Sequence, residues 1–558
     1  MLGGVCGLAA VIFHVSIDRM SKLAVMGAMN ARGYSWIPWT LVVPTVGGLV
    51  SGVLLQYVVP NARGSGIPQV KVVYAESENG VRLRDAIGKF FVSVIQIGTG
   101  SSLGREGPTV HICAGLASGI GRMLRVSPKN LRRLISVGAA AGIAAAFNAP
   151  IAAVTFTIEE IIGNLDQTML SGVIVAAAVA AVVERTMLGE NPEFTLPNGH
   201  FPTHAGSILL YAVLGVVAAL LSLAFTEGLL GLRKRFREQR LLPAWAQPAV
   251  GGLATGIMAI FAYGWLKTDG VTGGGYAALS NALAGHFMVK VLLPLCVFKL
   301  VATVFSYASG GAGGIFAPAL FIGAMAGGGV GAVDMVLFHH SAASMTSFAL
   351  VGMGAAFAGI IRAPITSVLI IIEMTNGYSL ILPLMIANML AYLIARHFRP
   401  TPIYEALLAQ DGIQLPSHAA AVHDLDGMSL SQVPLDNEPY ISIAVASLAN
   451  TIAARAASSR QGVYPVVNGG RIVGIIRTED VVGLSGDKAQ PVTAGEIMRP
   501  PVTVRKEDDL KTAVETMLAN QLRELPVIDE NGHVVGFVDE TSIARAYILV
   551  RQRSAQSD

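Results

Sequence analysis

The sequence predicts a polytopic all-α membrane protein with two homologous halves and broken helices, followed by a soluble α+β tail that is itself a tandem. Of its 558 residues, 53% are hydrophobic and only 13% are charged, whereas an ordinary soluble protein carries about 25% charged residues. Apolar stretches recur from the first residue to about residue 396, and charged, alternating sequence follows Arg399. Each part contains an internal repeat. We expect the two halves of the apolar part to be inverted, although the sequence alone leaves their relative direction open.

Several apolar stretches are too short, or too interrupted by glycine and proline, to cross about 30 Å of hydrocarbon as plain helices. Broken helices at membrane depth are tolerated where they are buried in protein or line a cavity, and in transporters they mark the binding site. The net charge of +3 is too small for this length to indicate a nucleic-acid partner. The three scattered cysteines indicate neither a disulfide framework nor a zinc site.

The first repeat lies in the apolar part. Residues 137–160 align without gaps to residues 351–374 and match at 10 of 24 positions. Upstream of each copy lies a helix opening rich in glycine and proline, at residues 104–110 and at residues 313–318. Two homologous halves that each contain a broken helix indicate one site at the interface between them.

The opening at residues 104–110, GREGPTV, places a lone carboxylate between glycines where an apolar helix begins. The first turn of a helix carries unpaired N–H groups and a partial positive charge, which attract anions. We interpret Glu106 as the anion already present there, which a mobile anion replaces when the carboxylate is protonated or swings away. This arrangement predicts a pH-sensitive gate in an anion pathway. The alternative is a glutamate that only complements the helix dipole.

The second repeat lies in the tail. Residues 464–476 and 525–538 each read as a strand, a turn and a strand, with a helix expected before each copy at about 446–458 and 509–520. This pattern predicts two similar soluble α+β modules in tandem.

Four separated motifs resemble the CLC family of chloride channels and chloride/proton exchangers. They are GSGIP at residues 64–68, GREGP at 104–108, GIFAP at 314–318 and PIY at 402–404. The tail resembles a pair of CBS (cystathionine β-synthase) modules, which many members of this family carry. The resemblance implies a transmembrane anion-transport domain over residues 1–410, a linker over 411–427, a first CBS module over 428–486, and a second module with the C-terminal tail over 487–558.

The resemblance also implies which residues bind the anion. Ser65 and Tyr404 correspond to residues whose hydroxyl groups meet the central ion, and a serine at position 65 favours chloride. Anion selectivity near the membrane midplane needs N–H and O–H donors without a full positive charge, so that the ion binds but leaves again. Without the resemblance, Ser65 reads as a helix N-cap and Tyr404 as an interfacial aromatic residue. The implied anion-binding residues are Ser65, Gly66, Ile67, Gly104, Arg105, Gly107, Ile315, Phe316 and Tyr404.

Two glutamates have implied roles in gating and proton transfer. Glu106 corresponds to the gating glutamate at the outer anion position, and Glu160 corresponds to the inner proton-transfer glutamate of the exchangers. In the repeat, Glu159 aligns with Glu373 whereas Glu160 aligns with Met374. This asymmetry favours Glu159 as a shared structural residue and Glu160 as an added functional one, because an ionisable residue inside the membrane is a functional hypothesis by default. The alternative for Glu160 is a solvated helix end.

Two positions depart from the pattern of the family. Lys71 stands where an acid near the inner glutamate is sometimes found, and we expect a lysine close to Glu160 to slow proton relay. In the first CBS module, Asp480 is the candidate for binding the ribose hydroxyls of an adenine nucleotide, but Arg477 replaces the serine or threonine expected three residues earlier. The alternative for the tail is a purely structural role.

The resulting hypothesis is a homodimeric, multi-pass protein of a bacterial inner membrane that exchanges chloride against protons. Basic residues at 233–240 and 396–399 favour the cytoplasmic side for these loops and for the CBS modules. One alternative is a passive voltage- or pH-gated chloride channel with a CBS regulatory tail, and another is a nucleotide sensor attached to a membrane anchor. An enzyme is not expected, because no catalytic motif occurs, and no cofactor or metal is expected to be required.

Overall fold

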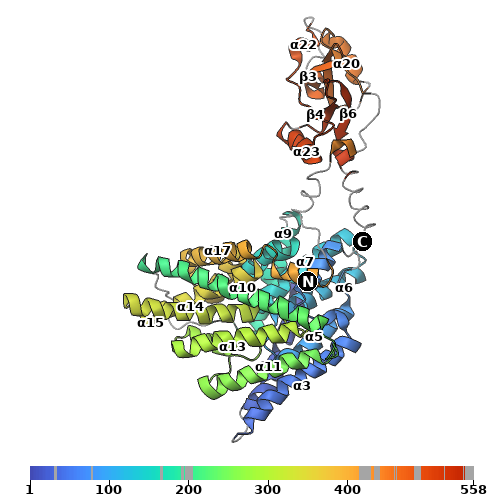
Figure 1. Cartoon of the computed structure of the whole chain (residues 1–558). Helices are drawn as coiled ribbons and strands as arrows, with labels where there is room; N and C mark the ends of the chain where they lie inside the picture. The colour runs from blue at the N-terminus through green and yellow to red at the C-terminus, as the bar shows by residue number, and fades with distance from the viewer. Residues whose placement is uncertain are drawn as a thin grey trace. The chain divides into compact units, whose positions relative to one another are not determined.

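The structure is a computed structural model that describes residues 1–29, 34–76, 80–163, 167–189, 194, 205–413, 429–432, 440–457, 459, 461–482, 492–520, 522–543 and 546. The chain divides into two compact units, Met1–Leu415 and Pro416–Asp558 (Figure 1). This division falls within the linker expected at 411–427, of which residues 414–427 lie outside the described part. The exact boundaries expected for the domains stay a prediction.

The first unit is helical within its described residues, and nine of the helical segments found there are long and apolar enough to cross a membrane. The helices of the first half are α1 (Leu2–Ser21), α2 (Gly27–Met29), α3 (Trp36–Tyr57), α4 (Ile67–Glu76), α5 (Leu83–Gly98), α6 (Glu106–Met123), α7 (Pro128–Phe147), α8 (Pro150–Phe156) and α9 (Gln167–Leu188). Those of the second half are α10 (Ile208–Glu238), α11 (Gln247–Phe261), α12 (Tyr276–Leu283), α13 (Val289–Ala308), α14 (Phe316–Phe338), α15 (Ala342–Ile361), α16 (Pro364–Thr375), α17 (Ile381–Phe398) and α18 (Ile403–Gln410).

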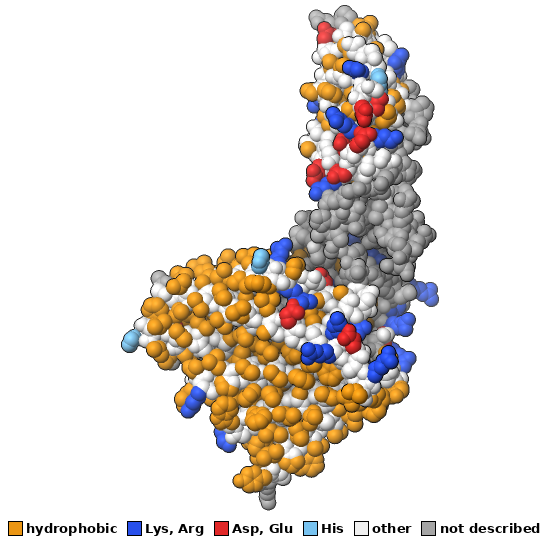
Figure 2. Space-filling view, in the orientation of Figure 1, with side chains coloured by type: hydrophobic (Ala, Val, Ile, Leu, Met, Phe, Trp, Pro, Cys, Tyr) orange, Lys and Arg blue, Asp and Glu red, His pale blue; other side chains and the backbone are white. Residues whose placement is uncertain are grey.

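Hydrophobic side chains cover most of the face of the first unit that Figure 2 shows. Large apolar residues are well exposed on several of its helices, for example Val175 at 62%, Leu209 at 74% and Val336 at 74%. A continuous apolar exterior of this extent is costly in water and is the surface that lipid tails cover. The fold is therefore that of a multi-pass membrane protein.

The two halves make reciprocal contacts, as the repeat predicts. Helices α3 and α11 touch backbone to backbone, because a Cβ at Gly48 would collide with the carbonyl oxygen of Pro248 and a Cβ at Gly252 would collide with that of Pro44. Small residues permit this close approach of membrane helices. Gly48 of α3 faces α11, and Gly252 of α11 faces α3 in the same way. Such reciprocal contacts are those of two bodies related by a two-fold rotation, so the halves are arranged about an approximate two-fold axis.

The second unit contains two small sheets of the same design. In each sheet a short first strand pairs in parallel with the second, and the second pairs antiparallel with the third. The first sheet consists of β1 (Ile443–Ala444), β2 (Val463–Asn468) and β3 (Arg471–Arg477), and the second of β4 (Val504–Arg505), β5 (Glu524–Ile528) and β6 (Val534–Asp539). The accompanying helices are α20 (Ala449–Ala457), α21 (Thr478–Val482), α22 (Ala494–Ile497) and α23 (Leu510–Ala519). Helices α20 and α23 confirm the two that the sequence predicts before the strand pairs.

Candidate functional site

The starts of α6 and α14, one from each half, meet at a two-residue bridge. The N–H of Gly104 donates to the carbonyl oxygen of Gly314 at 2.7 Å, and the N–H of Gly314 donates back to that of Gly104 at 2.7 Å. A Cβ at Gly314 would lie 3.1 Å from the backbone nitrogen of Gly107. A side chain at position 314 would therefore crowd the backbone at the start of α6. The unpaired N–H groups and positive dipole ends of both helices therefore converge on one small region.

The carboxylate of Glu106 lies in this region. Glu106 is the first residue of α6 and its side chain is buried. Its Oε1 accepts a hydrogen bond of 2.5 Å from the hydroxyl of Tyr276, and its Oε2 accepts one of 3.4 Å from the N–H of Ala317 in the first turn of α14. A carboxylate that starts one helix thus occupies an anion position at the start of the other.

Sequence reasoning did not find Tyr276, the first residue of the short helix α12. A signal was available, because Gly273, Gly274 and Gly275 directly precede it. Gly275 begins the helix at a φ of +78°, a backbone conformation that glycine adopts without strain. This turn directs α12 so that its first side chain reaches Glu106.

Ser65 and Tyr404 bring two buried hydroxyl groups together. Both residues have no exposed surface, and neither hydroxyl has a hydrogen-bond partner among the described residues. The hydroxyl of Tyr404 lies near the Ser65 side chain, and a Cβ at Gly107 would collide with the Ser65 hydroxyl. Buried polar groups are normally satisfied, so two such hydroxyls beside the start of α6 form a place where an acceptor, such as an anion, would bind.

Neither alternative interpretation of these two residues fits the geometry. The Ser65 hydroxyl does not cap α4, which begins at Ile67, since it makes no hydrogen bond within the described chain. Instead, the Ser65 N–H donates to the hydroxyl of Tyr307 at 3.4 Å. Gly66, at a φ of +102°, makes the turn into the helix. Tyr404 is fully buried within the protein, so its ring does not face lipid as an interfacial aromatic residue would.

Ile315 and Phe316 begin α14, with Ile315 as its N-cap and Phe316 as its first residue. The ring of Phe316 packs among three other aromatic rings, at centroid distances of 5.5 Å to Phe147, 5.0 Å to Phe156 and 4.7 Å to Phe357. This aromatic cluster anchors the first turn of α14. The side chain of Phe316 is thus used in packing, and what its backbone offers to an anion is the N–H group.

Arg105 directly precedes Glu106, but its guanidinium is engaged elsewhere. Its guanidinium stands 4.8 Å from the centre of the Tyr276 ring and donates to the carbonyl oxygen of Ala146 at 3.5 Å. A cation over an aromatic face is attracted by the ring quadrupole. Arg105 therefore holds Tyr276, the hydrogen-bond donor to Glu106, through its ring.

Two fully buried lysines, which sequence reasoning missed, lie at equivalent positions of the two halves. The offset between Gly104 and Gly314 is 210 residues (314 minus 104), and the same offset relates Lys89 to Lys299. The ammonium of Lys89 donates to the carbonyl oxygens of Ala62 at 2.8 Å and Gly64 at 2.5 Å.

In the second half, the Lys299 ammonium donates to the carbonyl oxygens of Val271 at 3.0 Å and Gly273 at 2.6 Å. Each lysine therefore binds the carbonyl groups of a segment that leads to a site residue. In the first half this segment precedes Ser65, and in the second half it precedes Tyr276. An ammonium group buried in this way also adds positive potential inside the membrane unit.

Glu160 is not a solvated helix end. Its side chain is 6% exposed, and its Oε1 lies 2.7 Å from the ammonium nitrogen of Lys71 on α4. It belongs to a π-helical segment, Thr157–Ile162, that continues α8, and π-bulges often occur at functional sites. The neighbouring Glu159 points elsewhere and accepts N–H groups from the start of α16.

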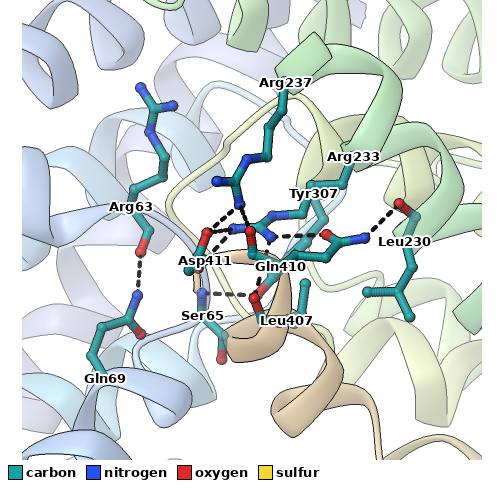
Figure 3. A network of polar contacts seen from close by, with 10 residues as sticks. All are labelled: Arg63, Ser65, Gln69, Leu230, Arg233, Arg237, Tyr307, Leu407, Gln410 and Asp411. Carbon is teal, nitrogen blue, oxygen red and sulfur yellow. Dashed lines mark hydrogen bonds and ion pairs between the residues drawn. The ribbon is translucent and has the colours of Figure 1, made fainter. Parts of the chain in front are cut away.

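A pocket of about 570 Å³ lies next to the segment that precedes Ser65. Its lining includes Arg63, Gly64, Gln69, His111, Arg233 and Tyr307. Figure 3 shows how the end of α18 is held beside it: the Arg233 guanidinium donates to both oxygens of Asp411, at 2.7 and 2.9 Å, and the Arg237 guanidinium donates to the same carboxylate at 2.6 Å. Because α18 also carries Tyr404, these ion pairs fix the helix that positions the buried hydroxyl.

In the second unit, Asp480 is engaged by a neighbouring cation. Its two oxygens accept hydrogen bonds from the Arg499 guanidinium at 2.5 and 3.0 Å, and one of them also accepts the N–H of Arg477 at 3.2 Å. The hydrogen bond from Arg499 holds the pKa of Asp480 below its ordinary value. A ribose at this carboxylate would have to displace Arg499.

Comparison with known proteins gives matches over both units. A family model described as voltage gated chloride channel matches residues 47–396, and one described as CBS domain matches residues 494–549. The H(+)/Cl(−) exchange transporter ClcA of Vibrio campbellii is 31% identical over 421 residues, covering 73% of this chain and 87% of the relative. A Ralstonia nicotianae protein named as a ClcB-like chloride channel is 34% identical over 399 residues, covering 69% and 90%.

Solved structures agree with the family match. The crystal structure of a slow cyanobacterial Cl⁻/H⁺ antiporter is 27% identical in sequence and superposes with a TM-score of 0.67, covering 74% of this chain and 96% of that one. The residues matched by the voltage gated chloride channel model, 47–396, include Gly104, Gly314 and Glu106.

Proposed function

Because the chain belongs to the voltage-gated chloride channel family, known as CLC, we propose that it exchanges chloride for protons, with Glu106 as the gate and Glu160 as the inner proton-transfer group. The observation that carries this proposal is the position of the Glu106 carboxylate. It starts α6 yet accepts the N–H of Ala317 at the start of α14, so it occupies the place that an anion would take. Relatives of this chain that are named H(+)/Cl(−) exchange transporters support the coupling to protons.

Charge and hydrogen bonding determine how the gate would work. Deprotonated Glu106 is held by the Tyr276 hydroxyl and by the N–H of Ala317 on α14, and it excludes chloride by occupying these donors. Protonation removes the charge that these donors stabilise, so the side chain swings out and chloride takes its place. The anion then lies between the donors of α14 and the hydroxyls of Ser65 and Tyr404. These donors carry no full charge, so the ion is bound but leaves again.

Glu160 would supply protons to this gate from the other side of the anion site. It is buried, and the Tyr404 hydroxyl lies within electrostatic range of both Glu160 and Glu106. A proton that reaches Glu160 is therefore close to the anion site, and in the proposed exchange it reaches Glu106 by a route other than that of the anion. This separation is what an exchanger requires, because a shared route would let chloride block the proton.

A passive chloride channel is the second candidate, and the ion pair between Lys71 and Glu160 favours it. A cation 2.7 Å from the carboxylate stabilises the charged form, which opposes proton uptake. Coupled exchange requires Glu160 to take up and release protons in each cycle, whereas a channel gated by Glu106 does not. Proton flux separates the two.

Further parts of the proposal concern assembly and location. We expect a homodimer in a bacterial inner membrane with the CBS modules in the cytoplasm. An adenine nucleotide is the proposed ligand of the modules, with Asp480 on the ribose. The ion pair of Asp480 with Arg499 favours the alternative, a purely structural role for this carboxylate, because a ribose would have to displace Arg499.

The gate is tested by chloride flux from liposomes that contain the purified protein, measured from pH 4 to pH 8. Wild-type flux should rise as the pH falls, because Glu106 becomes protonated. Glu106→Gln, which mimics the protonated side chain, should keep flux high and independent of pH while abolishing coupled proton movement. Flux in Glu106→Gln that still falls with rising pH would assign the gate to another residue.

A further inference from the structure

Three charged side chains from three elements meet beside Glu160. The ammonium nitrogen of Lys71 lies 2.7 Å from Oε1 of Glu160 and 3.6 Å from Oε1 of Glu405. Glu405 follows Tyr404 on α18 and was not singled out by sequence reasoning. The side chains are 6% exposed for Glu160, 11% for Lys71 and 44% for Glu405. The cluster therefore leads from a buried carboxylate to one that is open to solvent.

The charge of Lys71 limits what Glu160 can do alone. When Glu160 takes up a proton, its carboxylate becomes neutral and the ion pair with Lys71 is lost. A buried ammonium left without a partner is strongly destabilising. With no second carboxylate within reach, Lys71 would stabilise the charged form of Glu160 and would oppose proton uptake in every turnover. Glu405 is that second carboxylate.

We propose that Lys71 transfers its ion pair from Glu160 to Glu405 whenever Glu160 takes up a proton, which makes Glu405 a positioning residue for proton transfer. The inference rests on the proposed role of Glu160. The proton comes from water and binds to the Glu160 carboxylate, while the Lys71 ammonium keeps all of its protons and changes partner. On release of the proton, Lys71 returns to Glu160.

Within the described part of the chain, few other charged groups face Glu160. The charged and titratable groups in electrostatic contact with it are Lys71 on α4, Glu405 and Tyr404 on α18, and Glu159 on its own segment. The Glu159 carboxylate already accepts N–H groups of Ile365 and Thr366, so it is not available to Lys71. Among the described residues, Glu405 is therefore the carboxylate that can receive the ammonium.

The test measures coupled proton flux against pH with the full chain in liposomes. Glu405→Gln leaves Lys71 with Glu160 as its only partner, so the midpoint of the pH profile should move to lower pH by about one unit, a tenfold change in proton affinity. Lys71→Met removes the cation, and the midpoint should move to higher pH. In the double variant with both substitutions, the midpoint should lie close to that of Lys71→Met alone, because Glu405 acts through Lys71. Glu227→Gln, which removes an exposed carboxylate paired with Arg399, is the matched control and should shift nothing.

Two results would overturn the inference. One is an unchanged profile in both Glu405→Gln and Lys71→Met, which would make the cluster a static ion pair. The other is an equal shift by Glu405→Gln with and without Lys71, which would mean direct repulsion between the carboxylates. Glu160→Ala separates failure of the proposed function from failure of this inference: coupling that survives in Glu160→Ala contradicts the proposed function, whereas lost coupling with an unshifted Glu405→Gln contradicts only the exchange of partners. Retained chloride flux in each variant shows that it has folded.

Discussion

Glu159 and Glu373 lie at equivalent positions of the repeat, and each caps a helix of the opposite half. The carboxylate of Glu159 accepts the N–H groups of Ile365 at 3.1 Å and of Thr366 at 2.8 Å, at the start of α16. The carboxylate of Glu373 accepts those of Ile151 at 3.0 Å and Ala152 at 2.7 Å, at the start of α8. The same exchange in both directions shows that the two halves are joined by reciprocal helix capping.

This relationship predicts a structural role for both residues. Glu159→Gln and Glu373→Gln should each destabilise the membrane unit by about 1–2 kcal/mol, because each loses a charge at a helix N-terminus and one of two charge-assisted hydrogen bonds. Thermal unfolding in detergent measures the loss, with Glu227→Gln as a surface control. Chloride flux and proton coupling should persist in both variants. Loss of coupling in Glu159→Gln at unchanged stability would instead assign Glu159 to the proton pathway.

The second prediction concerns the donor to the gate. Tyr276→Phe removes the hydroxyl that donates to Glu106 and keeps the ring beneath Arg105. A hydrogen bond to a charged group contributes roughly 1.5–3 kcal/mol, so the charged, closed form of the gate loses about that much. Chloride flux at neutral pH should rise about tenfold or more. Unchanged flux would show that the N–H groups of α14 hold the gate without help from α12.

The third prediction concerns the buried lysines. Lys89→Met and Lys299→Met each leave carbonyl groups of an irregular segment without their donor, at a cost of about 1–3 kcal/mol for each buried carbonyl. Both variants should lower the unfolding temperature and reduce chloride flux, since the segments before Ser65 and Tyr276 lose their orientation. The matched control is Lys234→Met, because Lys234 is 67% exposed. Wild-type flux and stability in Lys89→Met would show that water replaces the ammonium.

The fourth prediction is a pH dependence in the tail. The hydrogen bond from Arg499 lowers the folded-state pKa of Asp480 below its ordinary value of 3.8. A carboxylate with a depressed pKa stabilises the fold above its unfolded-state pKa, and this contribution is lost as the pH falls through the folded-state pKa. The protection factors of the β3 amides in the full chain, which are the intrinsic exchange rates divided by the observed rates at the same pH, should therefore be high at neutral pH and should fall below about pH 4. Arg499→Gln should exchange faster at neutral pH and respond less to acid, and an identical acid response in both proteins would contradict the prediction.

Much of the fold was predictable because it depends on local and repeated patterns. Apolar stretches interrupted by glycine and proline predict the broken helices, and the gapless repeat predicts two halves that meet at one site. The repeat aligns Glu159 with Glu373 and Glu160 with Met374, and this difference predicts different roles for the two adjacent glutamates. The structure gives the two glutamates different partners: Glu159 contacts the start of α16, and Glu160 contacts Lys71.

The partners of these residues were not predictable in the same way. Tyr276 contacts Glu106 across 170 residues of sequence, and no local pattern specifies such a distant pair. Lys89 and Lys299 appear in the sequence only as charges within apolar stretches. The offset of 210 residues between the two glycine-rich openings, four fewer than the 214 of the gapless repeat, aligns the lysines with one another, so aligning the openings as well would have found them. Glu405 has no equivalent signal, because its role depends on the side chain of Lys71.

The most direct test of the central proposal is proton movement in liposomes that contain the purified protein under an outward chloride gradient, followed by external pH. We predict that protons move against their own gradient while chloride flows, and that Glu160→Ala abolishes this proton movement while chloride flux persists. Rapid chloride flux without any coupled proton signal in the wild-type protein would contradict exchange. It would make the protein a passive chloride channel in which Glu160 only balances the charge of Lys71.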